Sequence, residues 1–136
     1  MADSFNSLVN KAESSSSNFD SYEVDTSDKS IVMKLEIGAP GQKSLSRVKI
    51  DNSSLATNVN GEINNLKVGT NKSVRGRFLL VETVVTDILG GTDDTFIKFT
   101  LTGGPTGKYV CELSKTVSQA GDSVFYEIET QRQQAE

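Results

Sequence analysis

Residues 77–91, RFLLVETVVTDILGG, are the most apolar stretch of the chain. Side chains branched at Cβ dominate its middle, and they favour a strand because a helix restricts their χ1 rotamers. Between residues 78 and 88 both alternating faces are largely apolar, which is typical of a strand covered on two sides or serving two layers. The stretch therefore predicts a central strand that carries one glutamate, Glu82, in its middle.

Alternation of apolar and polar residues extends this β pattern through most of the chain after residue 21. Segments rich in glycine, proline and aspartate separate the alternating runs and predict turns. The predicted strands are 31–37, 44–51, 62–69, 78–88, 95–102, 108–117 and 123–130. About seven or eight strands at this spacing predict an all-β fold, an antiparallel β-sandwich or flattened barrel.

The turn chemistry also suggests how these strands connect. We expect the strands at 31–37 and 44–51 to pair as a hairpin through the Pro-Gly turn between them. The strand at 62–69 breaks strict alternation, which indicates a bulge or a sheet edge. The last four strands, joined by short glycine-rich turns, are expected to form a meander.

The length of 136 residues fits one domain, here predicted over residues 19–131 with a polar tail at 132–136. Residues 1–18 are predicted to form an N-terminal arm that ends in a serine-rich linker. Within the arm, spacings of three and four residues place one apolar stripe on a short helix, with Phe5, Leu8 and Val9 as its main members. Because so short a helix is marginal alone in water, its stripe needs a surface, in its own domain or in a neighbour.

Charge and composition exclude several classes of protein. The net charge of −4 argues against a general nucleic-acid binder, which usually has a basic footprint. The N-terminus lacks the basic and apolar regions of a secretory signal, and no apolar run is long enough for a membrane helix. With a single cysteine, Cys111, no internal disulfide can form. We expect a protein of the cytoplasm, or of a particle assembled there, without membrane contact.

Catalytic and metal-binding patterns are also missing from the sequence. There is no histidine, so this chain alone cannot build Ser-His-Asp or Cys-His catalysis or a histidine zinc site. Cys111 alternates in phase with Tyr109 and Leu113, which predicts a buried small apolar side chain rather than a reactive thiol. We therefore predict no enzyme activity, no catalytic residues, no cofactor and no metal site.

Two segments resemble functional loops but are better explained as turns. GGPTGK at 103–108 fails as a phosphate-binding loop, since Thr102 stands where its first glycine is needed and Tyr109 replaces the Ser or Thr. Asp87, Asp93 and Asp94 offer oxygens to calcium, but their spacing is not that of an EF-hand loop. Solvated turn aspartates are the favoured explanation.

Glu82 has two explanations. If its face is the core face, the buried carboxylate needs a cation such as Arg75 or Arg77. The favoured alternative places Glu82 on a polar or subunit-facing surface, and the core-facing residues are then Val81, Thr83 and Val85. A hydrolase that pairs Glu82 with Asp87 is disfavoured, because the two lie on opposite faces of a regular strand.

A basic segment precedes the central strand, with no acid among its charges: Lys67, Lys72, Arg75 and Arg77. Acidic residues gather elsewhere, at 20–28 and 122–129. Such segregation can seat acid against base between copies of one protein. A plain solvated surface is the favoured explanation of these charges. Contact with a polyanion is the least favoured, because the aromatic residues expected of a single-stranded nucleic-acid platform are not interleaved here.

These features favour a non-enzymatic structural or interaction module, a self-assembling or accessory subunit of a larger bacterial or viral assembly. Its partners are expected to be proteins, with a homo-oligomer favoured and nucleic acid disfavoured. The candidate partner contacts are Phe5, Leu8, Val9, Lys67, Lys72, Arg75, Arg77 and Glu82. The alternative is a β-sandwich that binds a small sugar or lipid, although the absence of Trp weighs against a sugar.

Overall fold

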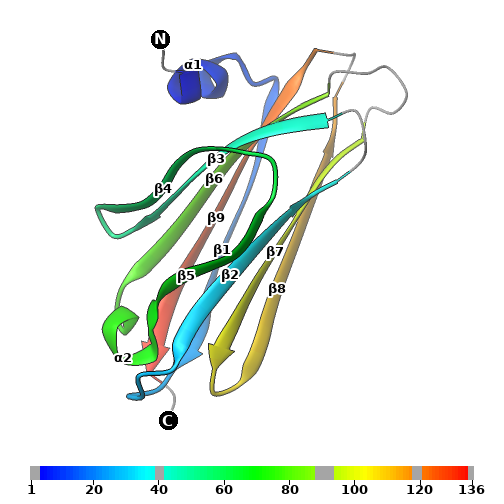
Figure 1. Ribbon diagram of the computed structural model, residues 1–136. Coiled ribbons are helices and arrows are strands. Elements are labelled where there is room, and N and C mark those ends of the chain that lie inside the picture. The colour runs from blue at the N-terminus through cyan, green and yellow to red at the C-terminus, as the bar shows by residue number, and fades with distance from the viewer. Residues whose placement is uncertain (1–3, 39–41, 88–93, 118–120, 135–136) are drawn as a thin grey trace.

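The protein was analysed as a computed structural model that describes residues 4–38, 42–87, 94–117 and 121–134. Two β-sheets pack face to face in the all-β sandwich that the alternation predicts (Figure 1). Helix α1 (Ser4–Lys11) lies at one end of the sandwich, and the short helix α2 (Asn71–Val74) lies at the other (Figure 1). We call these the α1 end and the α2 end.

The five-stranded sheet carries the predicted central strand at its centre. β1 runs parallel to β9, and the other neighbours are antiparallel. In spatial order its strands are β1 (Ser14–Val24), β9 (Ser123–Gln134), β6 (Phe78–Asp87), β3 (Gln42–Ile50) and β4 (Ser53–Asn60).

The four-stranded sheet is antiparallel throughout. Its strands are, in order, β5 (Ile63–Thr70), β2 (Ser30–Ile37), β7 (Asp94–Gly104) and β8 (Gly107–Thr116). The prediction of a bulge or an edge at 62–69 is confirmed on both counts, since β5 is an edge strand with register shifts against β2.

The core lies between the sheets and takes alternate residues from both. Val81, Thr83 and Val85 of β6 face into it, as predicted, and Cys111 is buried. Two pairs of hydroxyl groups in the core hydrogen-bond to each other, Thr83 with Ser46 at 2.8 Å and Thr95 with Tyr126, whereas the buried hydroxyls of Ser44 and Thr130 have no partner among the described residues. Such pairing matters because an unpartnered buried polar group is costly.

Two expectations about strand pairing are wrong. β2 and β3 are not a hairpin, because β2 pairs with β5 and β7 while β3 pairs with β4 and β6. The last four strands are not a meander either, since β7 and β8 pair in one sheet whereas β6 and β9 pair in the other. Alternation tells which side chains face the core, but a strand with one apolar face can join either sheet of a sandwich.

Two predicted boundaries also change. The serine run predicted as a linker is the first part of β1, paired with β9 from Ser14↔Val124 onward. Residues 132–134, predicted as tail, belong to β9. Polar residues can form strands when the neighbouring backbone supplies the ladder, because propensity is subordinate to pairing. The same reason explains why β4, which is mostly polar, escaped prediction.

The predicted glycine turn at 103–107 joins β7 to β8 at the α2 end. The Tyr22 hydroxyl accepts a hydrogen bond from the Gly104 N–H at 2.7 Å and donates one to the Gly107 carbonyl at 2.8 Å. A Cβ at Gly104 would lie 2.5 Å from the Glu23 carbonyl oxygen. The glycine therefore allows close backbone packing against β1, and the turn is structural.

Candidate functional site

The candidate site is the outer face of the five-stranded sheet, meaning the side that points away from the other sheet. On β6 this face carries Phe78, Leu80, Glu82 and Val84, which alternate with the core residues. α1 contacts β6 and β9 and covers only the part of the face near the α1 end. The face therefore has a covered part and an open part.

Phe5 anchors α1 in the covered part. Its side chain is only 5% exposed, and its ring packs edge to face against Phe125 of β9, with centroids 6.4 Å apart. The Arg47 guanidinium carbon lies 4.3 Å from the centroid of the same ring, in a cation–π arrangement. Leu8 and Val9 are half-buried. The apolar stripe of the predicted helix thus has its surface within the same chain.

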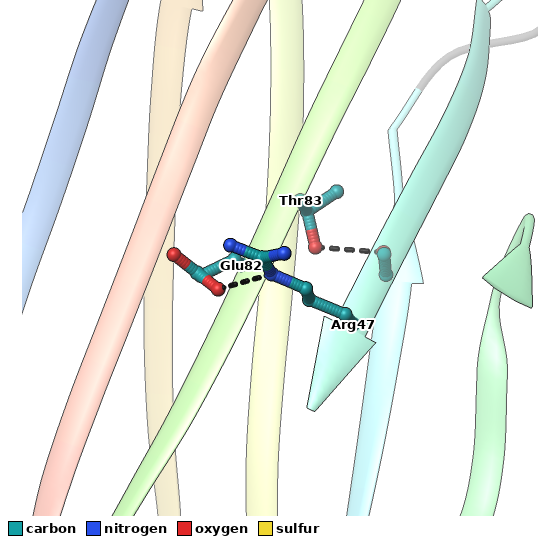
Figure 2. Close-up of polar contacts among 4 residues, drawn as sticks. Arg47, Glu82 and Thr83 are labelled. Atoms are coloured by element: carbon teal, nitrogen blue, oxygen red, sulfur yellow. Dashed lines mark hydrogen bonds and ion pairs between the residues drawn. The ribbon is translucent and has the colours of Figure 1, made fainter. Parts of the chain in front are cut away.

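Glu82 lies beneath this anchor and forms an ion pair with Arg47. The two residues are cross-strand partners on β6 and β3, and Arg47 Nε donates to Glu82 Oε1 over 2.6 Å (Figure 2). Glu82 belongs to the outer face, yet the side chains above leave it only 8% exposed. Its cation is Arg47 and neither Arg75 nor Arg77. The sequence could not identify that partner, because the register of β3 on β6 is a tertiary property.

The neighbouring strand β9 adds two carboxylates that the sequence analysis did not single out, Glu127 and Glu129. Glu127 is the cross-strand partner of Glu82. Burial raises the pKa of Glu127 above its ordinary value, and the charges of Glu82 and Glu129 raise it further. No ion pair among the described residues includes either side chain. The alternation of the EIE sequence at 127–129 could have indicated them, because Ile128 faces the core and both glutamates must then face outward.

The open part of the face exposes aromatic surface. Phe19 of β1 is 62% exposed and Phe78 of β6 is 36% exposed. Their rings stack with centroids 6.4 Å apart and planes at 28°. Leu80 and Glu129 lie beside them in the register of the sheet. Aromatic side chains left exposed together on a sheet face are typical of a contact surface.

The predicted basic contacts lie elsewhere, around α2 and the strands that flank it. Lys67 is on β5 of the other sheet, Lys72 is in α2, and Arg75 and Arg77 precede β6; all four are exposed. Arg77 Nη1 is 4.0 Å from Asp51 Oδ2, at the limit of an ion pair. The structure therefore does not bring the basic candidates together with Phe5, Leu8, Val9 and Glu82, which gather toward the α1 end.

A pocket of about 400 Å³ opens beneath α1. Its lining combines aliphatic side chains with a single cation and several small polar groups. The lining residues are Leu8, Lys43, Ser44, Leu45, Asn60, Val84 and Thr86. The size of the pocket falls within the range of small-molecule sites. Its cation is Lys43, and its aliphatic residues are Leu8, Leu45 and Val84.

Other chemistry receives little support from the residues that the structure describes. They contain no group of three acidic or cysteine side chains arranged to hold a metal ion. Asp87, expected to be solvated, is instead 1% exposed, and Asp93 lies outside the described residues. Neither described helix has the length and apolarity to span a membrane. Comparison of the chain with protein-family models, curated proteins and solved structures found no match.

Proposed function

We propose that this protein is a non-enzymatic interaction module that associates with itself and serves as a structural or accessory subunit of a larger assembly. The observation that carries the proposal is the exposed Phe19–Phe78 stack on a sheet face of which α1 covers only one part. Burial of aromatic side chains is the main source of affinity at protein interfaces. A face of this kind gains free energy when a partner excludes water from it.

The electrostatics of the same face supports contact with protein rather than with nucleic acid. Glu127 and Glu129 add negative charge beside the aromatic pair, and this would repel a phosphate backbone. The absence of histidine and the burial of Cys111 leave few groups for nucleophilic catalysis. Binding by apolar contact and charge complementarity is the function that these side chains support best.

The test is the solution mass of the full chain, measured by light scattering after gel filtration over a wide range of concentrations. We expect the mass to rise above that of the monomer, and Phe19→Ser with Phe78→Ser to abolish the rise. Val110→Ser is the matched control, because Val110 is also 40% exposed but lies on β8 of the other sheet. A wild-type chain that stays monomeric at every concentration would contradict the proposal.

Binding of a small lipid is a second candidate function, favoured by the pocket beneath α1. Leu8, Leu45 and Val84 offer an aliphatic wall, and Lys43 can meet an anionic head group. A medium-chain fatty acid should then raise the melting temperature, because a ligand specific for the native state stabilises it. Lys43→Met should reduce the rise. No shift with fatty acids of any length would remove this candidate.

A further inference from the structure

One row of side chains crosses the open part of the face with a positive charge at one end and a negative charge at the other. Two such rows in opposite directions would place each charge against its opposite. Lys49 of β3 and Glu129 of β9 are both cross-strand partners of Leu80 on β6, one on each side. The row therefore reads base, aliphatic, acid across three adjacent strands. Phe78 is the next outward residue on β6 and extends the apolar column between the two charges.

Lys49 and Glu129 do not form an ion pair with each other within one chain. Two strand spacings separate their backbones, about 10 Å, and Leu80 stands between them. Neither side chain takes part in an ion pair among the described residues. The same holds for Glu127, the next outward acid on β9. The open part of the face thus offers a cation on one flank and carboxylates on the other.

We propose that a second copy of this chain docks on the open part of the face, about a two-fold axis that runs along β6. Such an axis turns β3 of one copy toward β9 of its partner, so Lys49 meets the partner's Glu129 twice, once on each side. Leu80 and Phe78 then lie near the axis and pack against their symmetry mates. This inference rests on the proposed self-association and adds which surface mediates it.

Helix α1 limits the extent of this contact. Two bare sheets pack about 10 Å apart, which leaves no room for a helix between them. Because α1 stands on the face near the α1 end, the two sheets can approach closely only toward the α2 end. The open aromatic pair and the Lys49–Glu129 row lie on that uncovered part. The arm therefore restricts the dimer contact rather than bridging the two copies.

Charge reversal tests this arrangement. In a two-fold interface, two opposite charge reversals that each weaken the homodimer should restore association when the two variants are mixed. Lys49→Glu and Glu129→Lys should each weaken dimerisation by at least about tenfold, because each puts two like-charged pairs into the homodimer. An equimolar mixture of the two variants should recover association as a heterodimer, since one copy then carries two acids and the other two bases. One variant is isotopically labelled, because Lys and Glu are nearly equal in mass, and native mass spectrometry then distinguishes the heterodimer from either homodimer.

Lys115→Glu and Glu112→Lys are matched controls, because both residues are exposed on β8 of the other sheet and change the net charge equally. They should dimerise like the wild type, and their mixture should show no preference for the heterodimer. Circular dichroism and thermal melting establish that all variants fold.

The outcomes separate this inference from the function on which it rests. Dimerisation of the wild type, loss in both single variants and recovery in the mixture would support the interface. Dimerisation that survives both charge reversals would overturn the interface and leave self-association intact. A monomeric wild type would overturn both. Two single variants that fold and lose association without recovery on mixing would overturn the reciprocal geometry.

Discussion

The Arg47–Glu82 pair is the contact whose loss should be felt most at the scale of one residue. Arg47→Met leaves the Glu82 side chain, which is only 8% exposed, without its cation and removes the guanidinium that lies over the Phe5 ring. We expect a loss of about 2 kcal/mol in the free energy of unfolding, below the range for fully buried pairs because Arg47 is partly exposed. Replacing both residues by Met should recover most of the loss. Urea denaturation of Arg47→Met, Glu82→Met and the double variant measures this, and purely additive effects would argue against the pair.

Glu127 should give the protein a pH dependence of opposite sign to that of a salt-bridged acid. Its pKa is raised in the folded chain, so the folded state binds the proton more tightly than the unfolded state does. The free energy of unfolding therefore falls as pH rises from the usual glutamate pKa through the raised value. Glu127→Gln should stabilise by about 0.5 kcal/mol at neutral pH, a small effect because solvent screens the charges, and by almost nothing near pH 3. Urea titrations at both pH values measure the free energy of unfolding. Glu112→Gln, at an exposed position, is the control and should show no such dependence on pH.

At the scale of the element, α1 depends on a single aromatic anchor. An isolated helix of eight residues is unstable in water, so its order derives from the packing of Phe5. Phe5→Ala should remove about 2 kcal/mol of packing free energy and release the helix. Trypsin should then cut after the exposed Lys11 much faster than in the wild type. Asn6→Ala, on the exposed side, is the control, and equal rates in both variants would show that the anchor lies elsewhere.

The elements also differ in how far the sequence could predict them. β6 was predicted with its correct core face, because its apolar residues satisfy alternation on their own. β1 and β4 were missed over most of their length, since their polar residues become strands only through pairing with β9 and β3. The Arg47–Glu82 contact was missed for a related reason, because it depends on the register between two strands. The sequence therefore identified some residues of the candidate site, such as Phe5 and Glu82. It did not show which side chains contact each other across the sheet.

At the scale of the whole molecule, Asn71 ties together the α2 end of both sheets. Its side-chain amide donates to the carbonyls of Lys29 and Gly103, and its carbonyl accepts from the N–H of Asp25. Asn71→Ala removes the side-chain partners of the part-buried Asp25 N–H and Gly103 carbonyl, whereas the Lys29 carbonyl keeps the N–H of residue 71, and we expect a loss of about 2 kcal/mol. Amide hydrogen exchange should accelerate at this end of the sandwich first. Thr57→Ala, at an exposed position of β4, is the control.

The sequence by itself determined the all-β class, the central strand, the core-facing residues of β6 and the presence of an N-terminal helix, because side-chain alternation and spacing are local properties. Only the tertiary structure decided which strand joins which sheet, that the serine run pairs with β9, and that Phe5 docks on its own chain. It also decided that Glu82 meets Arg47, and that Lys49 and Glu129 flank one leucine. These contacts join residues distant in the chain, and their register follows from how both sheets bury apolar area together.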